Sequence, residues 1–171
     1  MGYAVSTAGD LGAAMTTVVL FTLLSTVPPD YANIVRAAFR RWVAYQAFAV
    51  QEATGPDAIE VTFDDPTRYW KYASSKTIGL AFSKAWGHER NLIVIRPREW
   101  QEDDLMAVLM HESAHILLSQ HSHSDRITSV LYRVLRPGAP VRLDWDDLMR
   151  LREEYSTVKP IPQDLVGANR P

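Results

Sequence analysis

The chain has 171 residues, a formal net charge of −2 and no cysteine. Its length suits a single domain over residues 1–171, and the lack of a basic block argues against a nucleic-acid surface, since phosphate binding needs clustered Lys and Arg. Without cysteine, neither a disulfide nor a thiolate ligand or nucleophile is available.

After a short N-terminal lead-in, the apolar residues 18–24 predict a buried strand. This run is too short to span a membrane and lacks the features of a secretory signal, so we expect no membrane partner, and the location stays open. A Pro28-Pro29 break follows, and Asp30 is the expected N-cap of a helix that runs to about Gln46. Apolar residues at helical spacing give this helix one packing stripe: Val35, Ala38, Phe39, Trp42 and Tyr45.

Four more apolar runs predict strands at residues 48–51, 59–63, 78–82 and 92–95. A helical period then begins at about Glu102 and continues into a histidine-rich segment. A last helix is expected at residues 144–155, with Asp146 and Asp147 in its first turn, where the helix dipole favours negative charge. The proline-containing tail from Lys159 is expected to be extended. Together these elements predict an α+β fold with a sheet of about five strands.

The histidine-rich segment begins with the motif H-E-S-A-H at residues 111–115. His111 and His115 are four apart on the predicted helix, so their imidazoles face the same way and can share one zinc ion. A catalytic zinc keeps three protein ligands and leaves a fourth position for water. Two further histidines, His121 and His123, are candidates for the third ligand.

The helix must end between His115 and His121 if His121 is to reach the metal. Ten residues at about 100° each would otherwise put His121 some 80° away from His111 around the helix axis. Glu112 lies beside the first ligand without being a ligand itself. A carboxylate there can take a proton from a zinc-activated water, which makes Glu112 the expected general base.

These features resemble the metzincin proteases, and among them the matrixins. His121-Ser122 is similar to the end of the matrixin zinc motif, and Leu131 falls where the family has the methionine of the turn below the metal. The segments 143–147 and 78–82 are similar to the last helix and to the edge strand of the family. The likeness covers most of residues 17–156.

The resemblance implies a Zn²⁺-dependent endopeptidase with a metzincin-like, mixed and twisted sheet. It makes His121 the expected third zinc ligand, with His123 as the alternative. It also implies a peptide or protein substrate held at the edge strand by Gly79, Leu80 and Ala81, because an extended peptide can add a strand to an open edge. It does not imply an oligomeric state.

The chain departs from the family pattern at two positions. Leu118 stands where these proteases turn on a glycine, so either the turn differs or a leucine takes a strained, left-handed conformation at about 1–2 kcal/mol. Leu131 replaces the methionine. Both departures favour the competing interpretation, a non-catalytic zinc-binding or interaction module that retains the metzincin fold.

Overall fold

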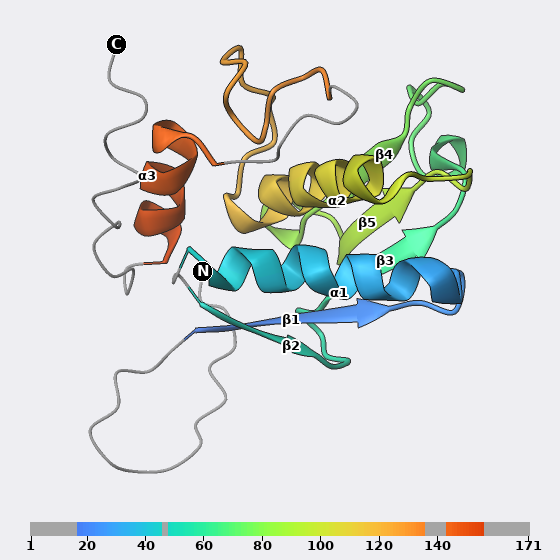
Figure 1. The fold of residues 1–171 in the computed structure, drawn as a ribbon, viewed down its shortest axis with the longest axis horizontal. Coiled ribbons are helices and arrows are strands. Elements are labelled where there is room, and N and C mark those ends of the chain that lie inside the picture. Colours follow the sequence, from blue (N-terminus) through green and yellow to red (C-terminus); the bar gives the residue numbers. More distant parts are fainter. Residues whose placement is uncertain (1–16, 46–47, 136–142, 156–171) are drawn as a thin grey trace.

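The computed structural model describes residues 17–45, 48–135 and 143–155. Five strands, two short 3₁₀ helices and three α-helices make up this part of the chain (Figure 1). In chain order they are β1 (Val18–Leu23), α1 (Pro29–Val43), β2 (Ala49–Glu52), β3 (Ile59–Phe63), η1 (Pro66–Arg68), β4 (Gly79–Phe82), η2 (Lys84–Trp86), β5 (Asn91–Ile95), α2 (Glu102–Leu117) and α3 (Trp145–Glu154).

The strands form one mixed sheet in the order β2-β1-β3-β5-β4. The pairs β1–β2, β1–β3 and β3–β5 are parallel, whereas β4 pairs antiparallel with β5. Strand β4 is therefore an edge strand of this sheet, and its outer backbone groups have no partner strand among the described residues.

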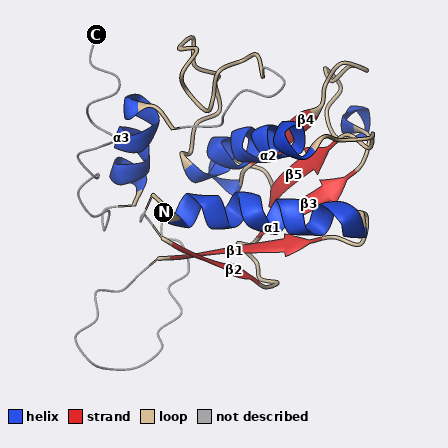
Figure 2. Ribbon diagram, in the orientation of Figure 1, coloured by secondary structure: helices blue, strands red, loops and turns tan. Residues whose placement is uncertain are grey.

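The two long helices α1 and α2 lie side by side across the sheet (Figure 2). The buried stripe of α1 packs on the strands, for example through the stacked rings of Phe21 and Phe39, whose centroids are 4.3 Å apart. Trp42 ties the two helices together, because its indole Nε1 donates to the Ser113 hydroxyl at 2.8 Å. The core thus holds the histidine-bearing helix α2 firmly against the sheet.

The predicted α+β fold with a mixed five-stranded sheet is confirmed, and each predicted strand lies within one residue of an observed one. The predicted stripe of α1 is also right: Val35, Ala38, Phe39 and Trp42 are buried.

The predicted N-cap of α1 is wrong. Pro28 is the N-cap, and Asp30 lies within the first turn, because Pro29 already has the fixed φ that suits a first helical position. The helix ends at Val43, and Gln46 and the tail from Lys159 lie outside the described residues. No helix among the described residues is long and apolar enough to cross a membrane.

Candidate metal centre

The histidine motif lies in the second half of α2, where all its side chains are buried. His111, Glu112 and His115 are between 4% and 6% exposed. Helix α2 begins with three acidic residues in its first turn and is apolar beyond them on nearly every side, as expected for a helix enclosed by the sheet, α1 and a covering loop. Burial of three titratable groups on one helix needs a compensating partner.

Backbone carbonyl groups fix the orientation of both imidazoles. His111 Nδ1 lies 2.8 Å from the Val130 oxygen, and His115 Nδ1 lies 2.7 Å from the Gln120 oxygen. A carbonyl oxygen only accepts, so each Nδ1 carries the proton and each Nε2 carries a lone pair. The two Nε2 atoms are 3.3 Å apart. Two lone pairs that face each other at this distance are the arrangement that a cation between them stabilises.

A third imidazole completes the group, and it belongs to His123. Its ring centroid lies 5.2 Å from that of His111 and 5.0 Å from that of His115. One ligand atom from each of the three histidines lies within 4.8 Å of the others. Two nitrogen ligands on one tetrahedral zinc at about 2.1 Å would be about 3.4 Å apart, so the spacing of the two Nε2 atoms fits zinc.

The predicted third ligand, His121, lies beside this group and not within it. Its ring packs edge-on against Trp86, with centroids 5.1 Å apart and an interplanar angle of 89°. Trp86 also lies edge-on to His115, at 6.4 Å. The indole Nε1 of Trp86 is buried and has no hydrogen-bond partner among the described residues.

The turn after α2 differs from the one that a left-handed Leu118 would make. Leu118 has φ −95° and is 5% exposed, so it is a packed residue in an ordinary conformation. The left-handed residue is Ser119, with φ 48°. The first alternative for Leu118, a different turn, is therefore confirmed, and no leucine is strained here.

Burial sets the protonation of the two helix histidines. Desolvation lowers the pKa of His111 to about 3, and the neighbouring His115 adds to this effect. Desolvation likewise lowers the pKa of His115 to about 4. Both imidazoles are therefore neutral near pH 7, which is the form that binds a metal ion.

The Glu112 side chain lies against Gly79 of β4. No described residue hydrogen-bonds to its carboxyl group, and desolvation raises the pKa of Glu112 to about 8. A divalent cation at the neighbouring histidines would favour the ionised carboxylate and oppose this rise.

Helix α3 supports the carbonyl group that orients His111. The Asp147 carboxylate accepts hydrogen bonds from the Ser129 hydroxyl and the Val130 N–H, both at 2.8 Å. It also closes a capping box with Asp144 at the start of α3. Leu131 follows directly and is 1% exposed, so the residue that stands in the methionine's place is buried in the hydrophobic core.

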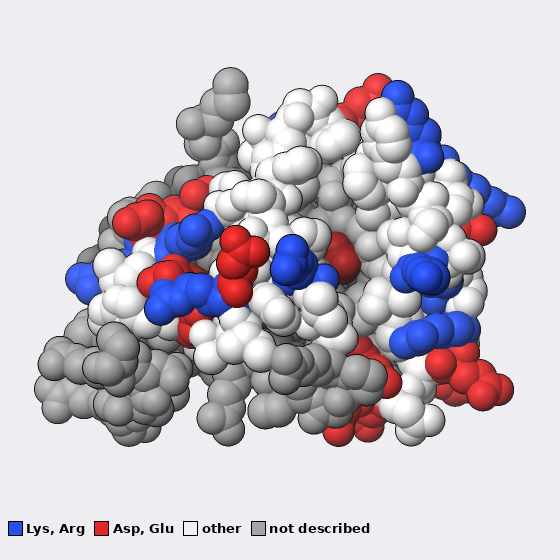
Figure 3. All heavy atoms as spheres, turned by 90° about the horizontal axis from the view of Figure 1, so that it is seen from above, with Lys and Arg blue, Asp and Glu red and all other residues white. Residues whose placement is uncertain are grey.

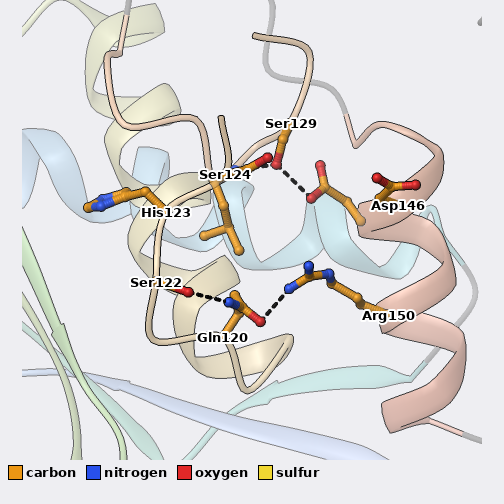
Figure 4. A pocket seen from close by; sticks show the side chains of 9 residues that line it. Gln120, Ser122, His123, Ser124, Ser129, Asp146 and Arg150 are labelled. Carbon is orange, nitrogen blue, oxygen red and sulfur yellow. Dashed lines mark hydrogen bonds between the residues drawn. The ribbon is translucent and has the colours of Figure 1, made fainter. Parts of the chain in front are cut away.

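The same helix reaches the residue that orients His115. Arg150 donates to the side chain of Gln120, and Gln120 donates to the Ser122 hydroxyl at 2.7 Å. These groups line a small pocket between the loop and α3 (Figure 4). The His123 ring points away from this pocket, whereas Asp146 and Arg150 approach it from α3.

Several residues of the site were not predicted. The carbonyl groups of Val130 and Gln120 carry no sequence signal, since every residue has one. Trp86 and Asp147 are far from the histidine motif in the sequence, and the fold brings them near it. Gly79, Leu80 and Ala81 do lie on the edge strand β4, as expected, and α2 packs beside this strand.

Comparison with known proteins gives one finding. A family model described as Matrixin matches residues 19–156. No curated protein matches the chain.

Proposed function

The chain belongs to the matrixin family, which is zinc-dependent in general, and from this premise we propose that it is a zinc endopeptidase that hydrolyses peptide bonds. The observation that carries the proposal is the pair of fixed Nε2 atoms 3.3 Å apart, next to the buried carboxyl group of Glu112. A structural zinc site has no need for a buried, unpaired carboxylate beside its ligands.

His111, His115 and His123 would hold the zinc. Their donor set suits this metal, because three neutral imidazoles leave one coordination position open. When bound, zinc lowers the pKa of a coordinated water to about 7 and polarises a substrate carbonyl. His121, the ligand expected from the resemblance, lies against Trp86 and would contribute to the wall of the site.

Glu112 performs the proton transfers. Its carboxylate oxygen accepts a proton from the water that attacks the carbonyl carbon of the scissile bond, and it then delivers this proton to the nitrogen of the leaving amine. Low accessibility to solvent keeps the proton on this path, because few bulk water molecules compete for the carboxylate.

The substrate would bind as an extended peptide along β4. This strand is at the open edge of the sheet, so a peptide can pair with its outer backbone groups. Figure 3 shows a hollow in the face that lies at the top of Figure 1, with an acidic group recessed at its floor. Gly79, Leu80 and Ala81 supply the backbone of β4 next to α2, the helix that carries Glu112.

Chelation tests this proposal. The purified protein should cleave an unstructured protein such as casein, a chelator should abolish the cleavage, and added zinc should restore it. Cleavage that persists in the zinc-free protein would contradict a metal-dependent mechanism.

A further inference from the structure

Gly79 is in unusually close approach to Glu112. A Cβ atom built on Gly79 would lie 2.5 Å from Glu112 Oε1, 2.9 Å from Cγ and 3.0 Å from Cδ. These distances are well inside van der Waals contact, and they involve three successive atoms of one side chain. The Glu112 side chain therefore lies in the space that any other residue at position 79 would fill.

We propose that Gly79 is a positioning residue for Glu112: the absent side chain at position 79 creates the slot between α2 and β4 in which the carboxyl group lies. The structural part of this inference stands on the contact alone. Its catalytic part rests on the proposed function.

The local structure explains why the slot cannot open by small movements. Gly79 pairs with Ile95 of β5, which is 0% exposed and lies in the core of the sheet. On the other side, α2 is fixed by the Trp42–Ser113 hydrogen bond and by the core. Neither backbone can retreat at low cost, so a methyl group at position 79 must displace the carboxyl group.

The slot also connects the base with the substrate. Strand β4 is both the wall against which Glu112 lies and the edge along which an extended peptide would pair. The position of the carboxylate relative to the scissile bond is then set by one strand. A displacement of about 1 Å can cost on the order of a hundredfold in rate.

The first test is a stability cycle in zinc-free protein with Gly79→Ala, Glu112→Ala and the double variant. Gly79→Ala alone should lower the thermal midpoint by about 3 °C or more. In the Glu112→Ala background it should cost little, because Cγ, Cδ and Oε1 are gone. An equal loss in both backgrounds would overturn the proposal, as would failure of both Gly79→Ala proteins to fold. If only the single variant fails to fold, the proposal is supported.

The second test uses the zinc-loaded protein and a peptide substrate. Gly79→Ala should lower kcat at least tenfold with KM and zinc content nearly unchanged. The loss should be smaller in Glu112→Asp, whose shorter side chain leaves room for the methyl group. A higher KM with unchanged kcat would instead assign Gly79 to peptide binding alone and overturn the positioning role.

Gly55→Ala is the matched control. Its added Cβ would meet Leu20 Cδ1 at 3.2 Å, the flexible end of an apolar side chain away from the site. The effect of Gly55→Ala on the thermal midpoint and on kcat should be the same whichever residue is at position 112. If it changes with that residue as much as the effect of Gly79→Ala does, the proposal is overturned. If wild type cleaves no peptide, the proposed function fails, but the stability cycle still decides whether Gly79 positions Glu112.

Discussion

The Nδ1 atom of His111 lies 2.8 Å from the backbone oxygen of Val130, a residue on the loop that follows α2. The N–H of the same residue donates to Asp147 of α3 at 2.8 Å. One peptide segment thus connects a buried carboxylate with a candidate metal ligand. The orientation of His111 depends on α3, although α3 contributes no ligand.

Asp147→Asn should therefore weaken zinc binding. The amide nitrogen cannot accept, so at least one of the hydrogen bonds from Ser129, Val130 and Asp144 is lost. We expect zinc affinity to fall about tenfold and the thermal midpoint to drop. Asp146→Asn is the control, because Asp146 is half-exposed and its ion pair with Arg126 lies on the surface. Competition with a chelating dye measures both affinities, and equal values in the two variants would argue against the role of Asp147.

The choice of third ligand predicts a difference between two neighbouring histidines. His123→Ala should lose zinc, whereas His121→Ala should retain close to one zinc per chain, because His121 packs on Trp86 outside the ligand group. Elemental analysis of the two proteins measures this directly. If His121→Ala loses zinc and His123→Ala retains it, the third ligand is His121.

The turn after α2 predicts opposite effects at adjacent residues. Leu118→Gly should lower the free energy of unfolding by about 2–4 kcal/mol, since it removes a buried side chain from an ordinary conformation. Ser119→Gly should be neutral or stabilising by up to about 1 kcal/mol, because Ser119 has φ 48°. Urea denaturation measures both, and a stabilised Leu118→Gly variant would show that the left-handed residue is Leu118.

The zinc-free protein should lose stability through Glu112 as pH rises. Its folded pKa of about 8 is above the ordinary value of 4.5, so the folded protein holds the proton more tightly than the unfolded chain does. This contribution is complete below pH 4.5 and is lost as pH rises through 8. Glu112→Gln lacks this contribution. Between pH 5 and 8 its free energy of unfolding should therefore rise relative to that of wild type by a few kcal/mol. Denaturation curves in a chelator test this, and a constant difference across that range would contradict the burial of Glu112.

The sequence predicted the features that depend on local spacing. Apolar runs of strand length and helical patterns located the sheet and the three α-helices of the described residues. The four-residue spacing of His111 and His115 placed both on one helix face, which is buried. The place of His123 beside the two helix histidines could not be predicted in this way. It follows from the course of the chain after α2, where Ser119 and not Leu118 takes the left-handed conformation.

Long-range contacts account for the rest of what was missed. The approach of Gly79 to Glu112 joins residues on different elements, and neither residue type reveals it. Asp147 was expected in the first turn of α3, where it lies, but its hydrogen bonds to Ser129 and Val130 come from the packing of α3 on the loop. Such contacts follow from the assembled fold and not from a pattern along the chain.

The most direct test of a hydrolytic zinc centre compares wild type with Glu112→Gln in the same preparation. The substitution removes the proton acceptor and keeps the size of the side chain. Zinc content should be equal in the two proteins, while the rate of casein cleavage in Glu112→Gln should fall by at least about a hundredfold. A zinc-loaded wild type that cleaves no peptide in a broad library, or a Glu112→Gln variant with the wild-type rate, would contradict the account.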